Sequence, residues 1–503
     1  MHIVSTAAGN HVVGTNFFGQ ARGIAIGVAP RAHIAMYKGL LKTDLDNLAG
    51  TPDVLTAIDQ AIADGVDILS ISLGFIDSGI WPESESFSDK GMPQFIKKWK
   101  GKYENGTQFS SSNCNKKLIR ARSFSKALRA TGLKIPPPEE DYDSVRDFQG
   151  HGMHTVSTAA GNHVVGTNCF GQARGIAIGV APRAHIAMYK GLVKTDLENL
   201  AGTPDVLAAI DQAIADGVDI LSISLGFCQM HYYQDVIAIG ALSAVEKGIF
   251  ISCFVSNDGK YDTVEVAAEW IATVGASTID RALTSTLKLE SGFEVEAQSY
   301  YLQNVKITNT SLYHGKGHSN KSIYAPGALD SSKIAEKVVC DQTDPHWIAY
   351  QWIEVSRKGA LAAIIITVQL LVPPIRSPIP TIFLPSTSGT SLINHLSGLS
   401  TEPKVKSWDM ISTKFGTKPA PQLGFFSSRG PPVSVGTLKP DIIAPGVDIL
   451  VAYTPNKPDV KLGSYDFVID YALLSGTSMA APHVVRIGAL IKKVHPEWSP
   501  STI

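Results

Sequence analysis

The chain has 503 residues, of which 44% are hydrophobic and 18% are charged, and its formal net charge is −1 at pH 7. This length allows a large core and suggests more than one domain. The balanced charge gives no sign of a nucleic-acid partner or an anionic membrane surface, and no apolar run is long enough to span a bilayer. The cysteines are too few and too scattered for a disulfide scaffold or a zinc site, and we expect no metal and no cofactor; they are Cys114, Cys169, Cys228, Cys253 and Cys340.

The N-terminal part of the chain is duplicated, since residues 2–75 and 154–227 differ at only five positions. Each copy holds a helix pattern ended by a glycine (Gly65 in the first copy) and then a strand pattern, at 66–73 in the first copy. We interpret the repeat as one segment of a single domain present twice, because a solenoid needs several short units. A single sheet has only one position for this segment. We expect the second copy to fill it, and the first copy to pack on the surface or replace missing N-terminal parts.

Two motifs in the first third of the chain carry residues suited to catalysis. An apolar run ends at Asp77 and breaks at Ser78-Gly79, as expected for a carboxylate at the C-terminal end of a buried strand, where open α/β sheets collect their catalytic groups. His151 lies between two glycines ahead of small residues that predict a tightly packed helix, and histidine is the usual general base near neutral pH. Taken singly, each residue is more often structural than catalytic.

A third motif near the C-terminus presents Ser478 in a turn of small residues, before a helix predicted from Met479 to about His495. A helix start supplies unpaired N–H groups that stabilise an oxyanion, although a simple helix cap is the alternative interpretation. The order Asp, His, Ser is one of the known triad orders. A lipase or esterase would instead need a Gly-x-Ser-x-Gly elbow and the order Ser, Asp, His.

With these motifs the chain resembles the subtilisin-like serine proteases (subtilases), specifically their plant members, over nearly all of its length. The aspartate motif covers 76–84, the histidine motif 150–155 and the serine motif 476–483, and two further stretches, 426–431 and 438–446, are also similar to the family. The resemblance implies an α/β fold, with a subtilisin-like catalytic domain whose mostly parallel sheet is flanked by helices. It also implies a serine-type endopeptidase that hydrolyses peptide bonds through an acyl-enzyme.

The resemblance assigns roles to individual residues. Ser478 would attack the scissile carbonyl, His151 would take its proton and pass it to the leaving amine, and Asp77 would orient the imidazole. Asn257 would be the second donor of the oxyanion hole, although Asn257-Asp258-Gly259 is by itself only a turn signal.

The resemblance also implies that a peptide lies extended beside 221–226, with the pocket for the residue before the cut lined by Ser224, Leu225 and Gly226. A buried core strand is the alternative for this segment. The chain departs from the family pattern at four positions near these sites. Phe227 replaces a glycine, Met153 a threonine, Lys260 a proline, and Ser256 a glycine where a positive φ is expected.

We expect four parts along the chain: the partial duplicate at 1–75, the first part of the catalytic domain at 76–299, an insert at 300–418, and the second part of the catalytic domain at 419–503. By the resemblance the insert is a protease-associated domain of mixed α/β structure. It would control substrate access or form a homodimer contact, and a passive surface domain is the alternative. The expected partner is a peptide or protein substrate, with no nucleic acid and no membrane.

The resemblance implies an extracellular protein of the apoplast or cell wall. Glycosylation sequons at Asn105, Asn309 and Asn320 fit a secreted glycoprotein. The chain shows no signal peptide or propeptide and stops soon after the serine helix, which suggests a partial or rearranged copy. The alternative function is therefore a catalytically inactive or unfolded subtilase fragment that at most binds peptides or proteins.

Overall fold

The computed structural model describes residues 71–503 apart from 93–102, 134–136, 138–139, 196–198, 302–305, 315–328, 344–347, 368–378, 410, 434–435, 459 and 463–464, and it describes only four short strands of residues 1–70. The chain divides into two compact units. One comprises Met1–Ser70 with Leu490–Glu497, and the other comprises Ile71–Ala489 with Trp498–Ile503.

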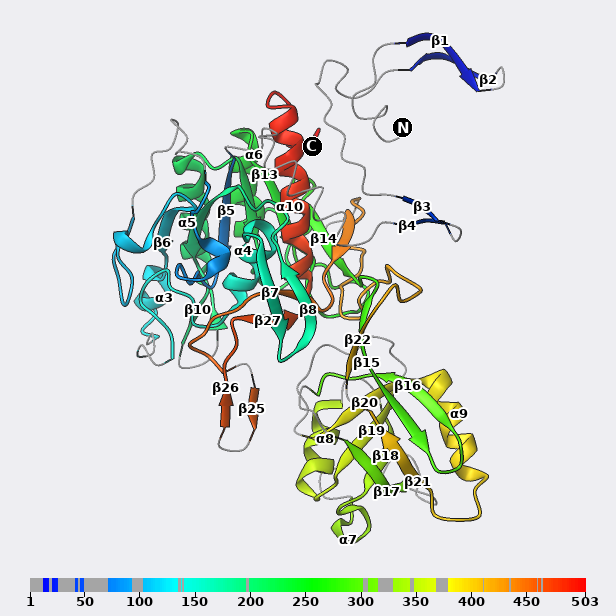
Figure 1. Cartoon of the computed structure of the whole chain (residues 1–503). Coiled ribbons are helices and arrows are strands. Elements are labelled where there is room, and N and C mark those ends of the chain that lie inside the picture. The colour runs from blue at the N-terminus through cyan, green and yellow to red at the C-terminus, as the bar shows by residue number, and fades with distance from the viewer. Residues whose placement is uncertain are drawn as a thin grey trace. The chain divides into compact units, whose positions relative to one another are not determined.

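A seven-stranded sheet forms the centre of the second unit, and every neighbouring pair of its strands is parallel. In spatial order the strands are β23 (Ile442–Pro445), β14 (Ala272–Ser277), β13 (Phe250–Phe254), β12 (Ile220–Ile223), β5 (Ser72–Asp77), β9 (His185–Lys190) and β6 (Leu118–Ser123). Figure 1 labels four of them, β14, β13, β5 and β6. A parallel sheet needs crossover connections, usually helices, that cover its faces. The helices along this part of the chain are η1 (Glu85–Phe87), η2 (Ser111–Asn113), α3 (Lys126–Ala130), α4 (His151–Ala160), α5 (Thr203–Asp216), α6 (Val236–Glu246) and α10 (Thr477–Val494). The predicted α/β class is confirmed.

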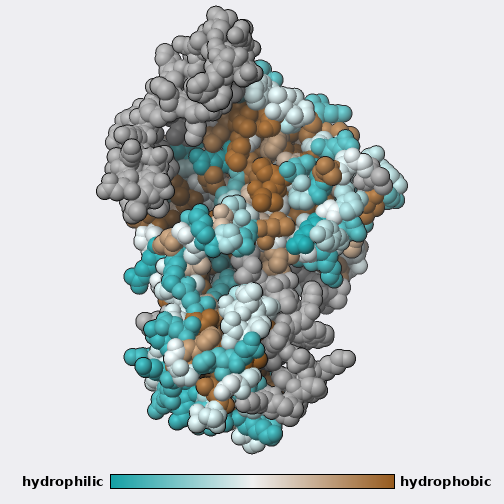
Figure 2. Space-filling model, turned by 90° about the vertical axis from the view of Figure 1, so that its right-hand side faces the viewer, coloured by the Kyte–Doolittle hydropathy of each residue, from teal (hydrophilic) through white to brown (hydrophobic). Residues whose placement is uncertain are grey.

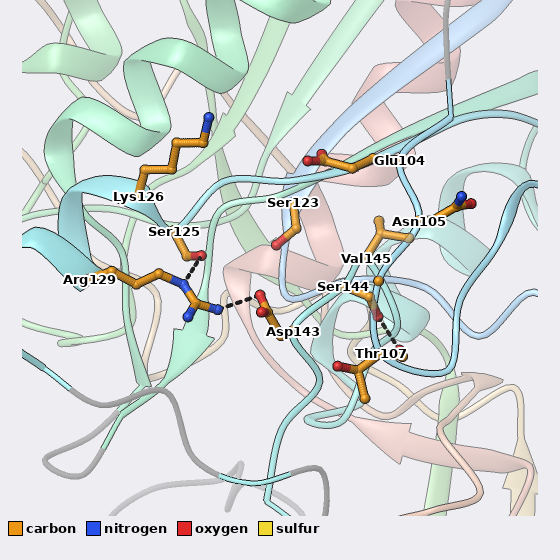
Figure 3. A pocket seen from close by; sticks show the side chains of 11 residues that line it. Glu104, Asn105, Thr107, Ser123, Ser125, Lys126, Arg129, Asp143, Ser144 and Val145 are labelled. Carbon is orange, nitrogen blue, oxygen red and sulfur yellow. Dashed lines mark hydrogen bonds and ion pairs between the residues drawn. The ribbon is translucent and has the colours of Figure 1, made fainter.

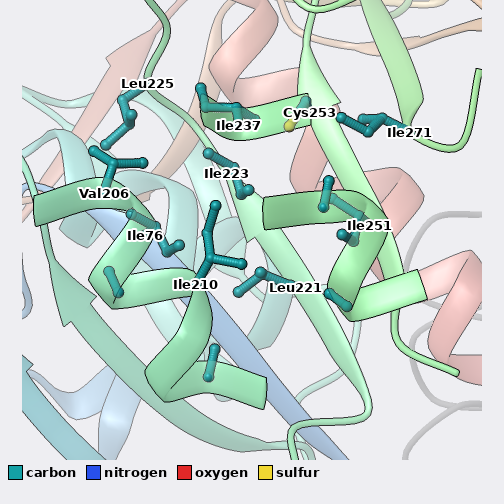
Figure 4. Packing of buried hydrophobic residues seen from close by; sticks show 14 of the residues in the cluster. Ile76, Val206, Ile210, Leu221, Ile223, Leu225, Ile237, Ile251, Cys253 and Ile271 are labelled. Atoms are coloured by element: carbon teal, nitrogen blue, oxygen red, sulfur yellow. The ribbon is translucent and has the colours of Figure 1, made fainter. Parts of the chain in front are cut away.

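The main core lies between one face of this sheet and the helices α5 and α6. Val206 and Ile210 of α5 and Ile237 of α6 meet Ile223 and Ile251 of the sheet, and all five side chains are buried (Figure 4). Full burial of one such side chain stabilises the fold by about 1.5–3 kcal/mol. This packing therefore fixes the ends of β12 and β13, after which candidate site residues follow.

Helix α10 lies against the opposite face of the same sheet. Ser252 stands between two core residues of β13, so its side chain points to the other face. Its hydroxyl donates a hydrogen bond to the carbonyl of Ala481 in α10 at 3.2 Å. The helix that carries Ser478 is thereby attached to the strand that leads to Asn257.

A second, eight-stranded sheet is built from the segment between β14 and β23. Its strands, in spatial order, are β16 (Glu294–Gln298), β20 (Thr381–Pro385), β19 (Ala362–Thr367), β18 (Val338–Thr343), β17 (Ile307–Tyr313), β21 (Lys404–Trp408), β15 (Arg281–Leu289) and β22 (Ser412–Phe415). Its helices are α7 (Ser331–Ile334), α8 (Ile348–Arg357) and α9 (Ser386–Ser397). The sheet has its own buried cluster, which includes Leu287, Ile364 and Leu392. Its identification as a protease-associated domain stays a prediction.

The two copies of the repeat form the same hairpins. Val12 of β1 (Val12–Phe17) pairs with Ala25 of β2 (Gln20–Ala25), as Val164 of β7 (Val164–Cys169) pairs with Ala177 of β8 (Gln172–Ala177). The remaining two-stranded pairs are β3 (Leu41–Thr43) with β4 (Asp46–Leu48), β10 (Val193–Lys194) with β11 (Asn199–Leu200), β24 (Ile449–Ala452) with β27 (Tyr471–Leu474), and β25 (Val460–Leu462) with β26 (Tyr465–Phe467).

Both copies also contribute to the seven-stranded sheet. The second copy supplies β9, α5 and β12, whereas the first copy supplies the first four residues of β5. The strands β5 and β12 are parallel neighbours, with Leu73 opposite Ile220 and Ile76 opposite Ile223. The helix pattern of the first copy lies outside the described residues. The last residues of the first copy are thus part of the central sheet and lead directly to Asp77.

The surface mixes polar and apolar residues, and hydrophobic side chains gather on part of the face drawn in Figure 2. In the edge strand β23, Ile442 and Ile443 have exposed fractions of 46% and 44%. None of the five cysteines is in a disulfide, and no helix in the described part of the chain is long and apolar enough to cross a bilayer. Nor do the described residues contain a His, Cys, Asp and Glu cluster suited to a metal ion.

Candidate active site

The structure brings Asp77 and His151 together, although 74 positions separate them in the sequence. Asp77 ends the central strand β5, and His151 begins α4. The distance between His151 Nδ1 and Asp77 Oδ1 is 2.6 Å. Asp77 is buried with 1% exposure of its side chain, whereas that of His151 is 31% exposed. The imidazole therefore has one edge on a buried carboxylate and remains accessible.

The hydrogen bond to Asp77 decides which ring nitrogen of His151 can act as a base. A carboxylate only accepts, so Nδ1 carries the proton and neutral His151 keeps a free lone pair on Nε2. Burial lowers the pKa of His151, but the charge of Asp77 and its hydrogen bond outweigh burial and raise that pKa above 6.5. The ring can therefore hold a proton that it has taken from a nucleophile.

Two further donors hold the Asp77 carboxylate. The backbone N–H of Ser78 donates to Oδ1 at 2.7 Å, and the hydroxyl of Thr155 donates to Oδ2 at 2.8 Å. Thr155 lies one helical turn after His151 on α4, so the same helix supplies the imidazole and a hydroxyl that holds the Asp77 carboxylate. Thr155 is not among the site residues that the sequence predicts.

Asp147 fixes the start of α4. Its side chain accepts hydrogen bonds from the N–H groups of Gly150 at 3.0 Å and Met153 at 2.8 Å, and from the hydroxyl of Ser78 at 3.1 Å. These bonds satisfy N–H groups at the helix start and tie the helix to the turn after Asp77. Asp147 is fully buried, and burial raises its pKa. Asp147 is also absent from the site residues that the sequence predicts.

The turn after Asp77 and the start of α4 approach so closely that a side chain would not fit between them. A Cβ on Gly152 would lie 2.2 Å from the carbonyl oxygen of Gly79. Gly79 itself has φ +128°, a conformation that favours glycine. The glycine after His151 is therefore required for the packing that brings the imidazole to Asp77.

Ser478 is the second residue of α10 and is 5% exposed. The preceding residue, Thr477, donates from its N–H to Asn257 Oδ1 at 2.9 Å, and its hydroxyl donates to the same oxygen at 3.0 Å. Because Oδ1 is occupied by these two donors, the amide Nδ2–H₂ of Asn257 is left for another acceptor. Asn257 is thereby brought directly to the serine turn, as an oxyanion donor must be.

Within the described part of the chain, no hydrogen bond joins the Ser478 hydroxyl to the His151 ring. Such bonds are often long without substrate and tighten only in the substrate complex.

A second histidine, His154, links the helices α4 and α10 indirectly. Buried His154 of α4 contacts the Ile449 carbonyl through Nε2 at 2.9 Å, and β24, which begins at Ile449, pairs with the strand that precedes Ser478. Burial lowers the pKa of His154 to about 3, so this ring is neutral.

The predicted substrate wall directly follows β12, at the C-terminal edge of the sheet. Ser224 and Leu225 are buried, and Leu225 belongs to the main core, so only their backbone is suited to contact a peptide. Gly226 is partly exposed. Phe227 packs against the same core. This placement is compatible with both interpretations of the segment 221–226, a wall of the substrate pocket and a buried core strand.

Two departures from the family pattern have visible structural effects. Ser256 has φ +95°, a region in which a non-glycine residue is strained, so the expected positive φ is present. Met153 is buried, and its sulfur lies 2.9 Å from the backbone nitrogen of Trp81, in the turn that follows Asp77.

The predicted glycosylation sites lie outside the catalytic cluster. Asn105 and Asn309 are exposed, and Asn320 lies outside the described residues. Asn105 borders a polar cavity of about 450 Å³, across which Arg129 and Asp143 form an ion pair of 2.5 Å (Figure 3). None of the predicted catalytic residues lines this cavity.

Comparison with known proteins assigns the chain to a family. The model of the peptidase S8, or subtilase, family matches residues 1–132 and 76–503. Subtilisin-like protease SBT1.3 of Arabidopsis thaliana is 36% identical over 88% of this chain and 58% of its own length. Subtilisin-like protease SBT3 of Solanum lycopersicum is 38% identical over 87% of this chain and 56% of its own length, and the CO(2)-response secreted protease of Arabidopsis thaliana is 38% identical over 86% and 56%.

Among solved structures, the psychrophilic subtilisin-like protease Apa1 from Pseudoalteromonas sp. AS-11 covers 88% of this chain and 88% of its own, with 13% identity and a TM-score of 0.39. The chain spans less than three fifths of the length of the curated relatives it matches, 58% for the first of them. The two matches of the family model overlap at 76–132 and together cover the whole chain. The chain belongs to the subtilase family.

Proposed function

We propose that this chain is a serine-type endopeptidase that hydrolyses peptide bonds through an acyl-enzyme. The observation that carries the proposal is the hydrogen bond of 2.6 Å between Asp77 and His151 at the carboxyl edge of a parallel sheet. It gives an accessible imidazole whose Nε2 is free to act as a base. Ser478 is the proposed nucleophile, and its place at the start of α10 supports this role.

In the proposed reaction His151 takes the proton of the Ser478 hydroxyl as the oxygen attacks the scissile carbonyl. The resulting imidazolium is stabilised by Asp77, and the oxyanion by the Ser478 N–H and the Asn257 amide. His151 then gives its proton to the leaving amine, and water releases the acyl group by the same steps in reverse. No metal or cofactor takes part in these steps.

Labelling with a fluorophosphonate tests the proposal, because this reagent reacts only with an activated serine. We expect the full chain to be labelled, the Ser478→Ala variant to be unlabelled, and the His151→Ala variant to lose nearly all labelling. Asn257→Ala should reduce peptidase turnover by about a hundred- to a thousandfold. A folded chain without labelling at Ser478 would instead support the inactive, peptide-binding alternative.

We further propose an extracellular location and a homodimer contact through the eight-stranded sheet. The first rests on the family and on the exposed sequons at Asn105 and Asn309. Analytical ultracentrifugation of the purified chain tests the second, and a monomer across the micromolar range would contradict it.

A further inference from the structure

The carboxylate of Glu265 lies between the predicted substrate wall and the segment that leads to Asn257. Glu265 lies between β13 and β14, and its Oε1 accepts a hydrogen bond of 2.9 Å from the hydroxyl of Ser256, next to Asn257. On the other side, a Cβ built on Gly226 would lie 2.5 Å from its Oε2. One carboxylate thus fills the space between the end of β12 and the residue before the proposed oxyanion donor.

Among the residues that the structure describes, this carboxylate has no compensating positive charge. No Lys, Arg or His of the described residues forms an ion pair with Glu265, although the side chain is partly buried. Burial, as the largest cause, raises its pKa, the hydrogen bond from Ser256 lowers it, and the negative charges of Asp258 and Asp235 raise it further. Burying an unpaired charge is costly, so a cation that reaches this position gains more than it would at a solvated carboxylate.

The surroundings of the carboxylate suit a long side chain with a charged end. Gly226 presents no side chain of its own, and the ring of Phe254 lies beside it, at 2.7 Å from the position of a Cβ on Gly226. The methylene groups of Lys or Arg would lie along this glycine and the aromatic ring, and the cationic end would meet Glu265. A short or purely apolar side chain would leave the carboxylate unpaired.

We propose that Glu265 is a specificity-determining residue that selects Lys or Arg as the substrate residue before the cleaved bond. The inference rests on the proposed peptidase function, because it assigns the Ser224–Gly226 segment to that substrate residue. The neighbouring acids Asp258 and Asp235 strengthen the attraction for a cation without contacting it.

Matched fluorogenic peptides that differ only in this residue test the proposal. Arginine and citrulline have nearly the same shape but differ in charge, so their kcat/KM ratio isolates the electrostatic contribution. We expect the ratio to be at least about tenfold in favour of arginine in the wild type, to approach one in Glu265→Gln, and to fall as salt is added. Glu269→Gln is the matched control, since Glu269 is exposed on the same segment and should leave the ratio unchanged.

A charge reversal protects the test against a variant that is merely unfolded. Glu265→Lys should prefer glutamate to glutamine in the same peptide, a gain that a misfolded protein does not produce. The proposal is overturned if the wild type shows no preference for arginine over citrulline, or if Glu265→Gln retains the preference.

Two further measurements distinguish failure of the proposed peptidase function from failure of the proposed role of Glu265. Fluorophosphonate labelling reports an active serine without using the pocket, so labelling together with equal cleavage of the two peptides overturns only the role of Glu265. If the chain is not labelled, the affinities of the two peptides for the Ser478→Ala variant test whether Glu265 selects a cation. An arginine peptide should bind at least about tenfold more tightly than its citrulline analogue, and equal affinities overturn the inference.

Discussion

Tyr300 donates a hydrogen bond of 2.9 Å to the carboxylate of Asp448, across 148 positions of the sequence. Both residues are buried. Asp448 in turn donates from its N–H to the hydroxyl of Ser475 at 2.9 Å, three residues before Ser478. The guanidinium of Arg281, in β15, donates to the Asp448 carbonyl. One buried acid therefore links the eight-stranded sheet to the turn that presents the proposed nucleophile.

The ionisation of Asp448 should make stability depend on pH. Burial raises its pKa to about 6, whereas an unfolded chain would keep the ordinary value of 3.8. A raised folded pKa means that the stabilising contribution is fully present below pH 3.8 and is lost as pH rises through 6. Asp448→Asn has no such step, so the stability of the wild type relative to this variant should rise by about 2 kcal/mol from pH 7 to pH 4.

Chemical denaturation of both proteins at several pH values measures this difference. Asp470→Asn is the control, because Asp470 is exposed. A constant difference between the wild type and Asp448→Asn across this range would show that the carboxyl does not titrate as the burial implies.

Removing the Thr155 hydroxyl should weaken catalysis without removing a triad residue. Thr155→Val keeps the shape of the side chain but leaves Asp77 Oδ2 without the donor that holds it at 2.8 Å. If the poorer orientation of Asp77 and His151 raises the activation free energy by about 1.4 kcal/mol, kcat/KM falls tenfold. Steady-state kinetics on one peptide tests this, and Thr155→Ser, which restores the hydroxyl, should recover most of the rate. Unchanged kcat in Thr155→Val would assign the hydroxyl to helix packing alone.

The positive φ of Ser256 predicts an unusual order of stabilities. Ser256→Gly removes the backbone strain and the hydrogen bond to Glu265, whereas Ser256→Ala removes only the hydrogen bond. The glycine variant should therefore be more stable than the alanine variant by about 1 kcal/mol, although glycine usually destabilises folded chains relative to alanine. Thermal unfolding of the two variants measures the difference. An alanine variant at least as stable as the glycine variant would be incompatible with the left-handed conformation.

The duplicated tetrapeptide Ser-Leu-Gly-Phe shows where prediction from sequence stops. Residues 72–75 and 224–227 are identical, yet the first set is a buried part of β5 and the second follows β12 after the strand has ended. In the first copy the strand continues through Ile76 to Asp77, so all six residues of β5 pair with β9 and four of them also pair with β12. Local propensity is the same in both copies, and the neighbouring strands decide the outcome.

Site residues can be predicted from one sequence where a local motif marks them, and not where only a contact across the fold does. Asp77, His151 and Ser478 lie in compact motifs that a single sequence displays, and the helix predicted from Met479 to about His495 is α10, at Thr477–Val494. Glu265 has no such local signal, and although Thr155 lies in the histidine motif, nothing in that motif indicates its contact with Asp77. Thr155 acts on a carboxylate 78 positions away, and Glu265 meets Gly226 only because β12 and β13 are neighbours.

The position of β5 leads to a prediction about the role of the first copy. A chain that begins at Ile71, after an initiating methionine, retains all six residues of β5. A chain that begins at Ile76 lacks the first four, and the sheet then loses the strand that joins β12 to β9. We expect the longer chain to unfold cooperatively and to react with fluorophosphonate as the full chain does. The shorter chain should do neither, since a gap in the middle of the sheet exposes the core beneath α5.

Circular dichroism melting and fluorophosphonate labelling compare the full chain with the two truncated chains. Full-length Ser478→Ala gives the baseline for labelling. If the chain from Ile71 failed to fold, residues 1–70 would be needed for more than the strand they precede, and the first copy would have a structural role of its own. If the chain from Ile76 folded and reacted, another segment would have to replace β5 beside β12, and the place of Asp77 at the end of that strand would no longer explain its approach to His151.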